Sequence, residues 1–330
     1  MSDFRLELKP RTGLDLLDAS VRLYRRHFGP LLGISSVLLV PFGVTYTLGM
    51  FFYYLAMGPF LTTGEMPANF RGDVPMLILG LALLILGLSI MAVLGPLSQG
   101  ALALAISEQY LGRTLGVLEA YRRVRRYWWP LFLVGLVFGL LGSIGPVAGG
   151  VLGAGAGLAL SGAATPVGAI VGGALGLVAG LPVAALFFTW FVFYEQTLVL
   201  EQVRGLDSLQ RSRSLVTGQG WRVFGILLLT GIGTSIATAV LAAPVSVTVS
   251  VIAGFRPEFL PYAQLLSQCA QQIVSVFLGP VFMIVQTLVY YDLRIRKEGF
   301  DLATMAAGLE SLRPVPVPAE LSPPASGDPQ

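Results

Sequence analysis

Three acids raise the question of carboxylate chemistry, because each lies close to the end of a long apolar stretch. They are Glu108, Glu195 and Asp292. Each falls near an expected helix C-terminus, where the helix macrodipole disfavours negative charge by about 0.3–1 kcal/mol. Carboxylates so placed can pair with arginine, or can gather at one point to bind an ion or a proton. We expect structural ion pairs with arginines of surface helices, and a shared ion or proton site is the alternative.

A proline precedes each acid by 12 or 13 residues. The three prolines are Pro96, Pro182 and Pro280. Proline removes a helix hydrogen bond and bends the helix, and at ~1.5 Å per residue the bend lies about 18 Å from the acid, near the middle of a bilayer. Interrupted helices at matching places are a feature of transporter binding sites. Proline kinks are also ordinary in membrane helices, so transport is an alternative function.

A short phrase recurs ahead of three apolar stretches and places an acid four residues before an arginine, an order that stabilises a helix surface. The copies are 17–22, 118–123 and 206–211. Apolar residues spaced by three and four in these segments predict amphipathic helices lying along the membrane surface. Their arginines are candidates for pairing with the acids and for binding lipid headgroups, the alternative being topology and surface solvation alone. The candidates are Arg22, Arg25, Arg26, Arg122, Arg123, Arg126, Arg211 and Arg213.

Composition requires a bilayer around the elements that carry these residues. Apolar residues make up 55% of the 330-residue chain and charged residues 12%, against roughly 25% charged in soluble domains. Six stretches exceed the ~20 residues that a helix needs to cross the hydrocarbon. We expect membrane spans at about 31–57, 75–107, 128–160, 166–199, 223–252 and 264–291.

The distribution of Lys and Arg sets the expected orientation. Of 21 such residues, 19 fall on one side of the six spans and only two on the other. The positive-inside rule then places both termini in the cytoplasm, in a cell membrane. The expected fold class is all-α, with six transmembrane helices in three parallel repeats at about 12–112, 113–203 and 204–300, each preceded by an amphipathic interfacial helix. Residues 1–310 form one polytopic domain, and the proline-rich 311–330 is expected to be a disordered cytoplasmic tail.

Two small-residue and polar patterns predict helix packing. Glycines step by four through residues 145–157 and again through 168–180, which predicts close packing of the third and fourth spans against each other, with self-association of protomers or a pore lining as the alternative. Four glutamines share one face of the sixth span. We expect this face to point into the helix bundle, where the amides form interhelical hydrogen bonds or line a polar substrate path. They are Gln264, Gln268, Gln271 and Gln272.

No catalytic or metal-binding pattern stands out. The single Cys269 excludes an intrachain disulfide and a cysteine metal cluster, and His27 has no second ligand beside it. Zinc-protease, phosphate-loop and serine-hydrolase motifs are missing from the sequence, and the spans lack ionisable groups. We therefore expect no enzyme activity, no cofactor and no nucleic-acid partner. Membrane lipids, especially anionic ones, are the expected partners.

Three segments resemble a known membrane family. The opening 13–32, the stretch 206–224 and the segment 290–301 are similar to bacterial proteins described as the glycerophosphoryl diester phosphodiesterase membrane domain. Some members fuse this region to a catalytic barrel, for which this chain has no room, so no catalytic residue carries over. The resemblance implies a stand-alone multi-pass membrane protein. The expected function is that of a non-enzymatic accessory or lipid-interacting module, with a small-solute or lipid transporter as the alternative.

Overall fold

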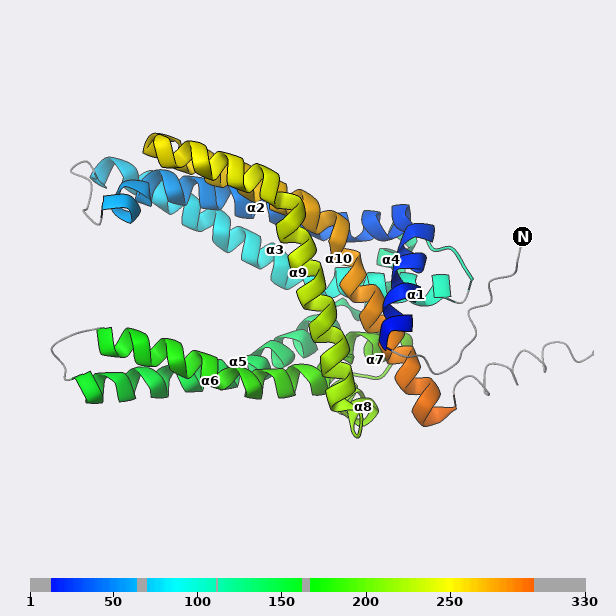
Figure 1. Cartoon of the computed structure of the whole chain (residues 1–330). Coiled ribbons are helices and arrows are strands. Elements are labelled where there is room, and N and C mark those ends of the chain that lie inside the picture. Colours follow the sequence, from blue (N-terminus) through cyan, green and yellow to red (C-terminus); the bar gives the residue numbers. More distant parts are fainter. Residues whose placement is uncertain (1–12, 64–69, 111, 162–166, 300–330) are drawn as a thin grey trace, which may run out of the picture.

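The computed structural model describes residues 13–63, 70–110, 112–161 and 167–299 (Figure 1). Within these ranges every regular element is a helix, which confirms the all-α prediction. Six helical segments are long and apolar enough to cross a membrane, as the sequence predicts. The tail expected at 311–330 lies outside the described ranges.

The long helices form three consecutive hairpins. They are α2 (Phe28–Thr63) with α3 (Phe70–Tyr110), α5 (Trp128–Ser161) with α6 (Val167–Phe191), and α9 (Gly220–Phe255) with α10 (Leu260–Glu298). A short helix precedes each hairpin, namely α1 (Gly13–Arg26), α4 (Val117–Val124) and α8 (Asp207–Val216). Two 3₁₀ turns, η1 (Arg125–Tyr127) and η2 (Pro257–Phe259), lead into α5 and α10. The sequence did not predict α7 (Tyr194–Leu200), which follows a break in the fourth span at residues 192–193.

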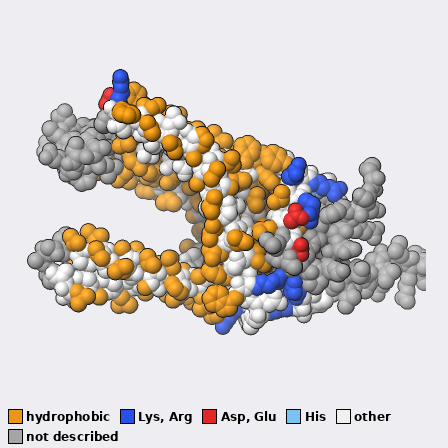
Figure 2. Space-filling view, viewed as in Figure 1, with side chains coloured by type: hydrophobic (Ala, Val, Ile, Leu, Met, Phe, Trp, Pro, Cys, Tyr) orange, Lys and Arg blue, Asp and Glu red, His pale blue; other side chains and the backbone are white. Residues whose placement is uncertain are grey.

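The hairpins gather into two arms. Helix α10 packs against α9 and α2, and α2 packs against α3, so these helices form a four-helix arm. Helices α5 and α6 pack along each other and form a separate hairpin arm, which diverges from the first (Figure 1). The short helices and the adjoining ends of α3, α6 and α10 join the two arms, and we call this end of the molecule the base. Figure 2 shows apolar side chains along both arms, an open space between them, and most of the visible charges at the base.

The buried core lies in the base. Residues 101–109, 192–199 and 283–293 are almost continuously buried, belong to one hydrophobic cluster, and each contain one of the three acids. Removing a large apolar side chain from water contributes about 1.5–3 kcal/mol, a gain that exists only where water would otherwise reach it. In a bilayer, apolar arms are solvated by lipid instead of water, so burial contributes most in the base.

The three short helices bury equivalent positions. In each recurring phrase the residue after the acid is buried, and so is the residue four positions later. The pairs are Ala19 and Leu23 in α1, Ala120 and Val124 in α4, and Ser208 and Ser212 in α8. On the exposed side of α1, Val21 is the apolar side chain and Asp18, Arg22, Arg25 and Arg26 are the charged ones. Helix α1 therefore has one stripe against the protein and a mainly charged side turned outward.

The hairpin arm is held by its glycines. A Cβ atom added at any of eight seam glycines would lie less than 3.0 Å from an atom of the opposite helix backbone, a distance that real Cβ atoms essentially never show. The facing pairs are Gly145 with Gly180, Gly149 with Gly176, Gly153 with Gly172, and Gly157 with Gly168. One antiparallel register thus aligns both glycine rows, as predicted for close packing within the hairpin. This face is covered within the chain.

The proline and glutamine patterns have a mixed outcome. Pro96, Pro182 and Pro280 lie inside α3, α6 and α10, but Pro146 and Pro244 also lie inside α5 and α9. Internal proline is therefore not confined to the second helix of each hairpin, which weakens its link to a transport site. Of the four glutamines on α10, Gln272 lies against Gly43 of α2, Gln264 and Gln268 are half-buried, and Gln271 is exposed.

Candidate functional site

The candidate site is the charged base, and Glu108 lies on its rim. Glu108 belongs to the last turn of α3, where the sequence places it. Its Oε1 lies 3.3 Å from Nη1 of Arg123, and its Oε2 lies 3.6 Å from Nη1 of Arg113. Arg123 comes from α4, one of the expected surface helices. The two cations offset the unfavourable helix-end position of the carboxylate.

Asp292 is buried and is held by two arginines. The side chain is 2% exposed, and its Oδ2 accepts hydrogen bonds from Nη1 of Arg222 at 2.6 Å and from Nε of Arg296 at 2.8 Å. Neither donor is among the eight expected arginines. Arg222 begins α9, and Arg296 lies one turn after Asp292 on α10. The spacing of four residues to Arg296 was a visible signal for this pair, whereas the contact with Arg222 depends on tertiary packing.

Glu195 departs from the expectation. No arginine of the described residues pairs with it, and the hydroxyl of Tyr194 donates to its Oε1 at 2.9 Å. Its Oε2 has no hydrogen-bond partner within the described part of the chain. The physical reason lies in the break of the fourth span. Because the helix restarts at Tyr194, Glu195 occupies the first turn of α7, where the helix dipole favours negative charge instead of opposing it.

Side chains from α8 and α10 satisfy the backbone at this break. Ser212 Oγ donates to the carbonyl of Trp190 at 2.9 Å and accepts from the backbone N–H of Phe193 at 3.1 Å. Gln286 Nε2 donates to the carbonyl of Val192 at 2.7 Å. Groups freed where a helix ends need such partners when buried. The sequence analysis missed both residues, and their only sequence signal was a polar residue within an apolar stretch.

A second charge network ties α8 to the end of α10. Glu201 Oε2 lies 2.7 Å from Nε of Arg211, and Arg211 also pairs with Glu298. Arg294 Nε lies 3.1 Å from Glu298 and 3.7 Å from Glu201. Tyr290 donates to Glu201 at 2.6 Å. Burial acts to lower the pKa of Arg211, but its hydrogen bonds with Glu201 and Glu298 outweigh burial and raise that pKa.

This network also explains why the third recurring phrase differs from the others. Arg22 pairs with Asp18 within α1, and Arg123 pairs with Glu119 within α4, each four residues apart as the sequence predicts. The equivalent Arg211 points instead to Glu201 and Glu298. Two acids on neighbouring elements, Glu201 and Glu298, pair with Arg211 in place of its local partner Asp207.

Comparison with known protein families identifies a family without adding an activity. Residues 96–293, more than half of the chain, match a family described as a domain of unknown function (DUF7847). This chain belongs to the DUF7847 family. No curated protein matches it, and no solved structure matches it. The match does not name the glycerophosphoryl diester phosphodiesterase membrane domain. The DUF7847 protein is a multi-pass membrane protein whose matched region runs from Pro96 to Leu293 and contains all three buried core segments.

The other five of the eight expected arginines divide into two groups. The Arg126 guanidinium carbon lies 4.7 Å from the centroid of the Tyr127 ring, and that of Arg213 lies 4.4 Å from the Trp190 ring, both suited to cation–π attraction. Arg25, Arg26 and Arg122 are exposed, and none forms an ion pair with a described residue. These three are open to an external anion.

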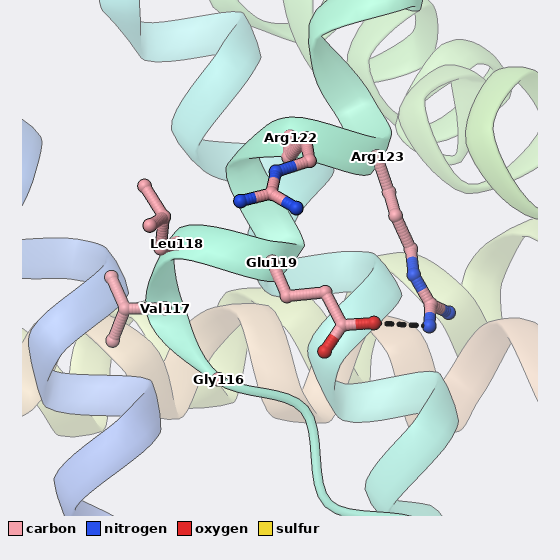
Figure 3. A pocket seen from close by; sticks show the side chains of 6 residues that line it. All are labelled: Gly116, Val117, Leu118, Glu119, Arg122 and Arg123. Carbon is pink, nitrogen blue, oxygen red and sulfur yellow. Dashed lines mark hydrogen bonds and ion pairs between the residues drawn. The ribbon is translucent and has the colours of Figure 1, made fainter.

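A surface cavity of about 540 Å³ lies beside one of the open arginines, at the start of α4 (Figure 3). It is lined by Gly116, Val117, Leu118, Glu119, Arg122 and Arg123. Figure 3 shows Glu119 joined to Arg123, so the cavity wall includes a neutralised pair together with Arg122. Three or more His, Cys, Asp or Glu side chains able to hold a metal ion do not cluster anywhere in the described residues.

Proposed function

We propose that this protein is a non-enzymatic membrane module that binds anionic lipids, with headgroups at the base and acyl chains against the arms. The observation that carries the proposal is the exposed side of α1. Leu16, Ala19 and Leu23 are buried against the protein, whereas Val21 is exposed, and Arg25 and Arg26 stand exposed at the end of the same helix without an intrachain ion pair in the described residues. A helix of this kind lies in the headgroup layer and gains from negative lipids.

The orientation that suits this function places the base in the cytoplasm of a cell membrane. Nearly all Lys and Arg residues flank that end of the spans, and the cytoplasmic leaflet carries the anionic lipids. Trp221 and Trp129, at the base ends of α9 and α5, are 87% and 57% exposed, as befits rings at the headgroup level. Both termini follow to the cytoplasmic side.

We further propose that the three hairpin units are internal repeats related by an axis near the membrane normal. The matching order of a short helix and a hairpin, and the equivalent buried positions of the short helices, support this relation. The resemblance to the phosphodiesterase-associated membrane domain agrees with a membrane role.

A transporter of lipids or small solutes is the second candidate. The open space between the two arms favours it, because apolar walls facing such a space suit an acyl chain moving between leaflets (Figure 2). Scrambling of fluorescent lipids in proteoliposomes tests this candidate. A rate equal to that of protein-free vesicles removes it.

Lipid binding is tested by native mass spectrometry of protein released from nanodiscs that contain phosphatidylglycerol and phosphatidylcholine. We expect retained lipid to be mainly phosphatidylglycerol. The triple variant R25Q/R26Q/R122Q should lose most of it, because about 1 kcal/mol per basic residue near an anionic surface amounts to roughly a hundredfold in affinity for three residues. The matched control is R256Q, which removes an exposed arginine at the opposite end of α9. Equal retention by the triple variant and R256Q would contradict headgroup binding at the base.

A further inference from the structure

Two acids of the base are equally buried and have opposite surroundings. The Glu195 and Asp292 residues are each 2% exposed. Asp292 accepts from two guanidinium groups, whereas Glu195 has one neutral donor, Tyr194, and an Oε2 with no partner in the described residues. Full burial in low-dielectric surroundings opposes the charge of a carboxylate by more than the start of the seven-residue α7 favours it, so a buried carboxylate without a counter-charge is neutralised by binding a proton.

Most charged groups of the elements around α7 are engaged with other partners. The titratable group in contact with Glu195 within the described residues is Tyr194. Glu108 of α3 pairs with Arg113 and with Arg123 of α4. On α8, Arg211 pairs with Glu201 and Glu298, and Arg213 lies over the Trp190 ring. On α10, Asp292 pairs with Arg222 and Arg296. From η1, Arg126 lies over the Tyr127 ring and Arg125 is exposed, as is Asp207 at the start of α8. None of these forms an ion pair with Glu195.

Glu195 lies where the two arms separate. The hydroxyl of its partner Tyr194 is 3.0 Å from the place that a Cβ of Gly135 would take, and Pro96 Cγ is 3.6 Å from the same place. Gly135 belongs to α5 of the hairpin arm and Pro96 to α3 of the four-helix arm. The Tyr194 ring also packs against Phe138 of α5, with centroids 5.3 Å apart. The Tyr194–Glu195 hydrogen bond thus sits at the root of the hairpin arm.

We propose that Glu195 is a proton-binding site of this protein, and that the bound proton holds the hairpin arm in place against the four-helix arm. A protonated carboxyl keeps Oε1 as an acceptor for Tyr194 and puts no charge into the apolar junction. Loss of the proton places a charge there that attracts water between Tyr194, Gly135 and Pro96, and loosens the root of the arm. This proposal goes beyond lipid binding, since neither the proton nor the movement of the arm is needed for headgroups to bind.

Protonation is tested by dicyclohexylcarbodiimide, an apolar reagent that adds to protonated carboxyl groups. The carboxyl oxygen bonds to the central carbon of the reagent, the proton moves to one of its nitrogens, and nothing is released. In the whole protein in nanodiscs, peptide mapping by mass spectrometry compares Glu195 with Asp292, a matched control of equal burial. We expect about tenfold or more labelling of Glu195 over Asp292 at neutral pH, falling as the pH is raised. Equal labelling, no labelling of Glu195, or labelling that does not change with pH would overturn the proposal.

Movement of the arm is tested by spin-label distances. One pair joins the arms, at Leu152 of α5 and Val240 of α9, and a control pair lies within the four-helix arm, at Val40 of α2 and Val240. All three positions are exposed, and C269S removes the native thiol. We expect the inter-arm distribution to widen at alkaline pH while the control pair stays unchanged.

The variant E195Q keeps a neutral side chain of the same shape and should hold the inter-arm distance constant at every pH. If the inter-arm distribution still widened in E195Q, Glu195 would not be what holds the arm. The same would follow if the inter-arm distance of the parent protein did not change with pH. Because retained lipid is measured separately, failure here leaves lipid binding at the base standing, and failure of lipid binding leaves this site standing.

Discussion

The hairpin arm and the base pack helices by different means. In the arm, α5 and α6 meet backbone to backbone along a row of glycines. In the base, helix ends meet through buried side chains, ion pairs and hydrogen bonds from serine and glutamine. The difference follows the solvent. Within lipid there is no hydrophobic force to bring apolar helices together, so close van der Waals contact must do so. Near water, burial and charge pairing both contribute.

The two regions should therefore respond to opposite kinds of substitution. The base should be sensitive to loss of a charge and the arm to gain of a single methyl group.

The largest expected effect is in the base. D292N leaves Arg222 and Arg296 without their buried carboxylate, and breaking a buried pair costs about 3–5 kcal/mol. The two arginines remain about 30% exposed, so we expect the lower end of this range. The free energy of unfolding in mixed detergent micelles measures the loss. E119Q is the control, because it removes an acid from an exposed pair, and such pairs contribute at most about 1 kcal/mol. Similar losses for the two variants would mean that Asp292 is solvated.

The next effect is in the arm. G153A places a methyl group against the backbone of Gly172, and we expect overpacking to cost about 1–3 kcal/mol. The matched control is G155A, two residues away on the same helix, where an added Cβ meets nothing within 4 Å. That substitution should stabilise the helix by about 0.5–1 kcal/mol, because alanine loses less backbone entropy than glycine. The same unfolding measurement compares the two. If G153A were as stable as G155A, the arm would not depend on close backbone packing, and the proposed difference between the arm and the base would be wrong.

Sequence periodicity predicted the arm better than the base. The two glycine rows share one spacing, and one antiparallel register aligns every member, so local pattern was enough. The six spans were visible for the same reason, since apolar length alone identifies them.

The base was predicted only in part, because its contacts join residues far apart in the chain. The arginine pair of Glu108 was foreseen from charge placement, but Glu195 was assigned to the wrong end of a helix. Nothing local marks the break at 192–193, whose backbone is satisfied by Ser212 and Gln286 from other helices. The role of Glu201 was missed for a similar reason, since the local spacing pairs its partner Arg211 with Asp207.

The smallest effect lies on the rim of the base and concerns the recurring phrase. Double-mutant cycles measure the coupling between an acid and the arginine four residues later, free of each residue's other contacts. We expect about 0.3–0.5 kcal/mol for Asp18 with Arg22, the value for an exposed helix pair. We expect no measurable coupling for Asp207 with Arg211, because Arg211 is engaged by Glu201 and Glu298.

The same cycle applied to Glu201 and Arg211 should give more than the Asp18 cycle, since Glu201 is only 13% exposed at its side chain and Arg211 30%. Coupling energies fall with salt for exposed pairs and hold better for buried ones. Repeating the cycles at high salt should therefore reduce the Asp18 coupling most. If Asp207 coupled to Arg211 as strongly as Asp18 does to Arg22, the third short helix would behave as a surface helix like the first. Arg211 would then not join α8 to α10, and apolar burial and the Asp292 pair alone would hold the base together.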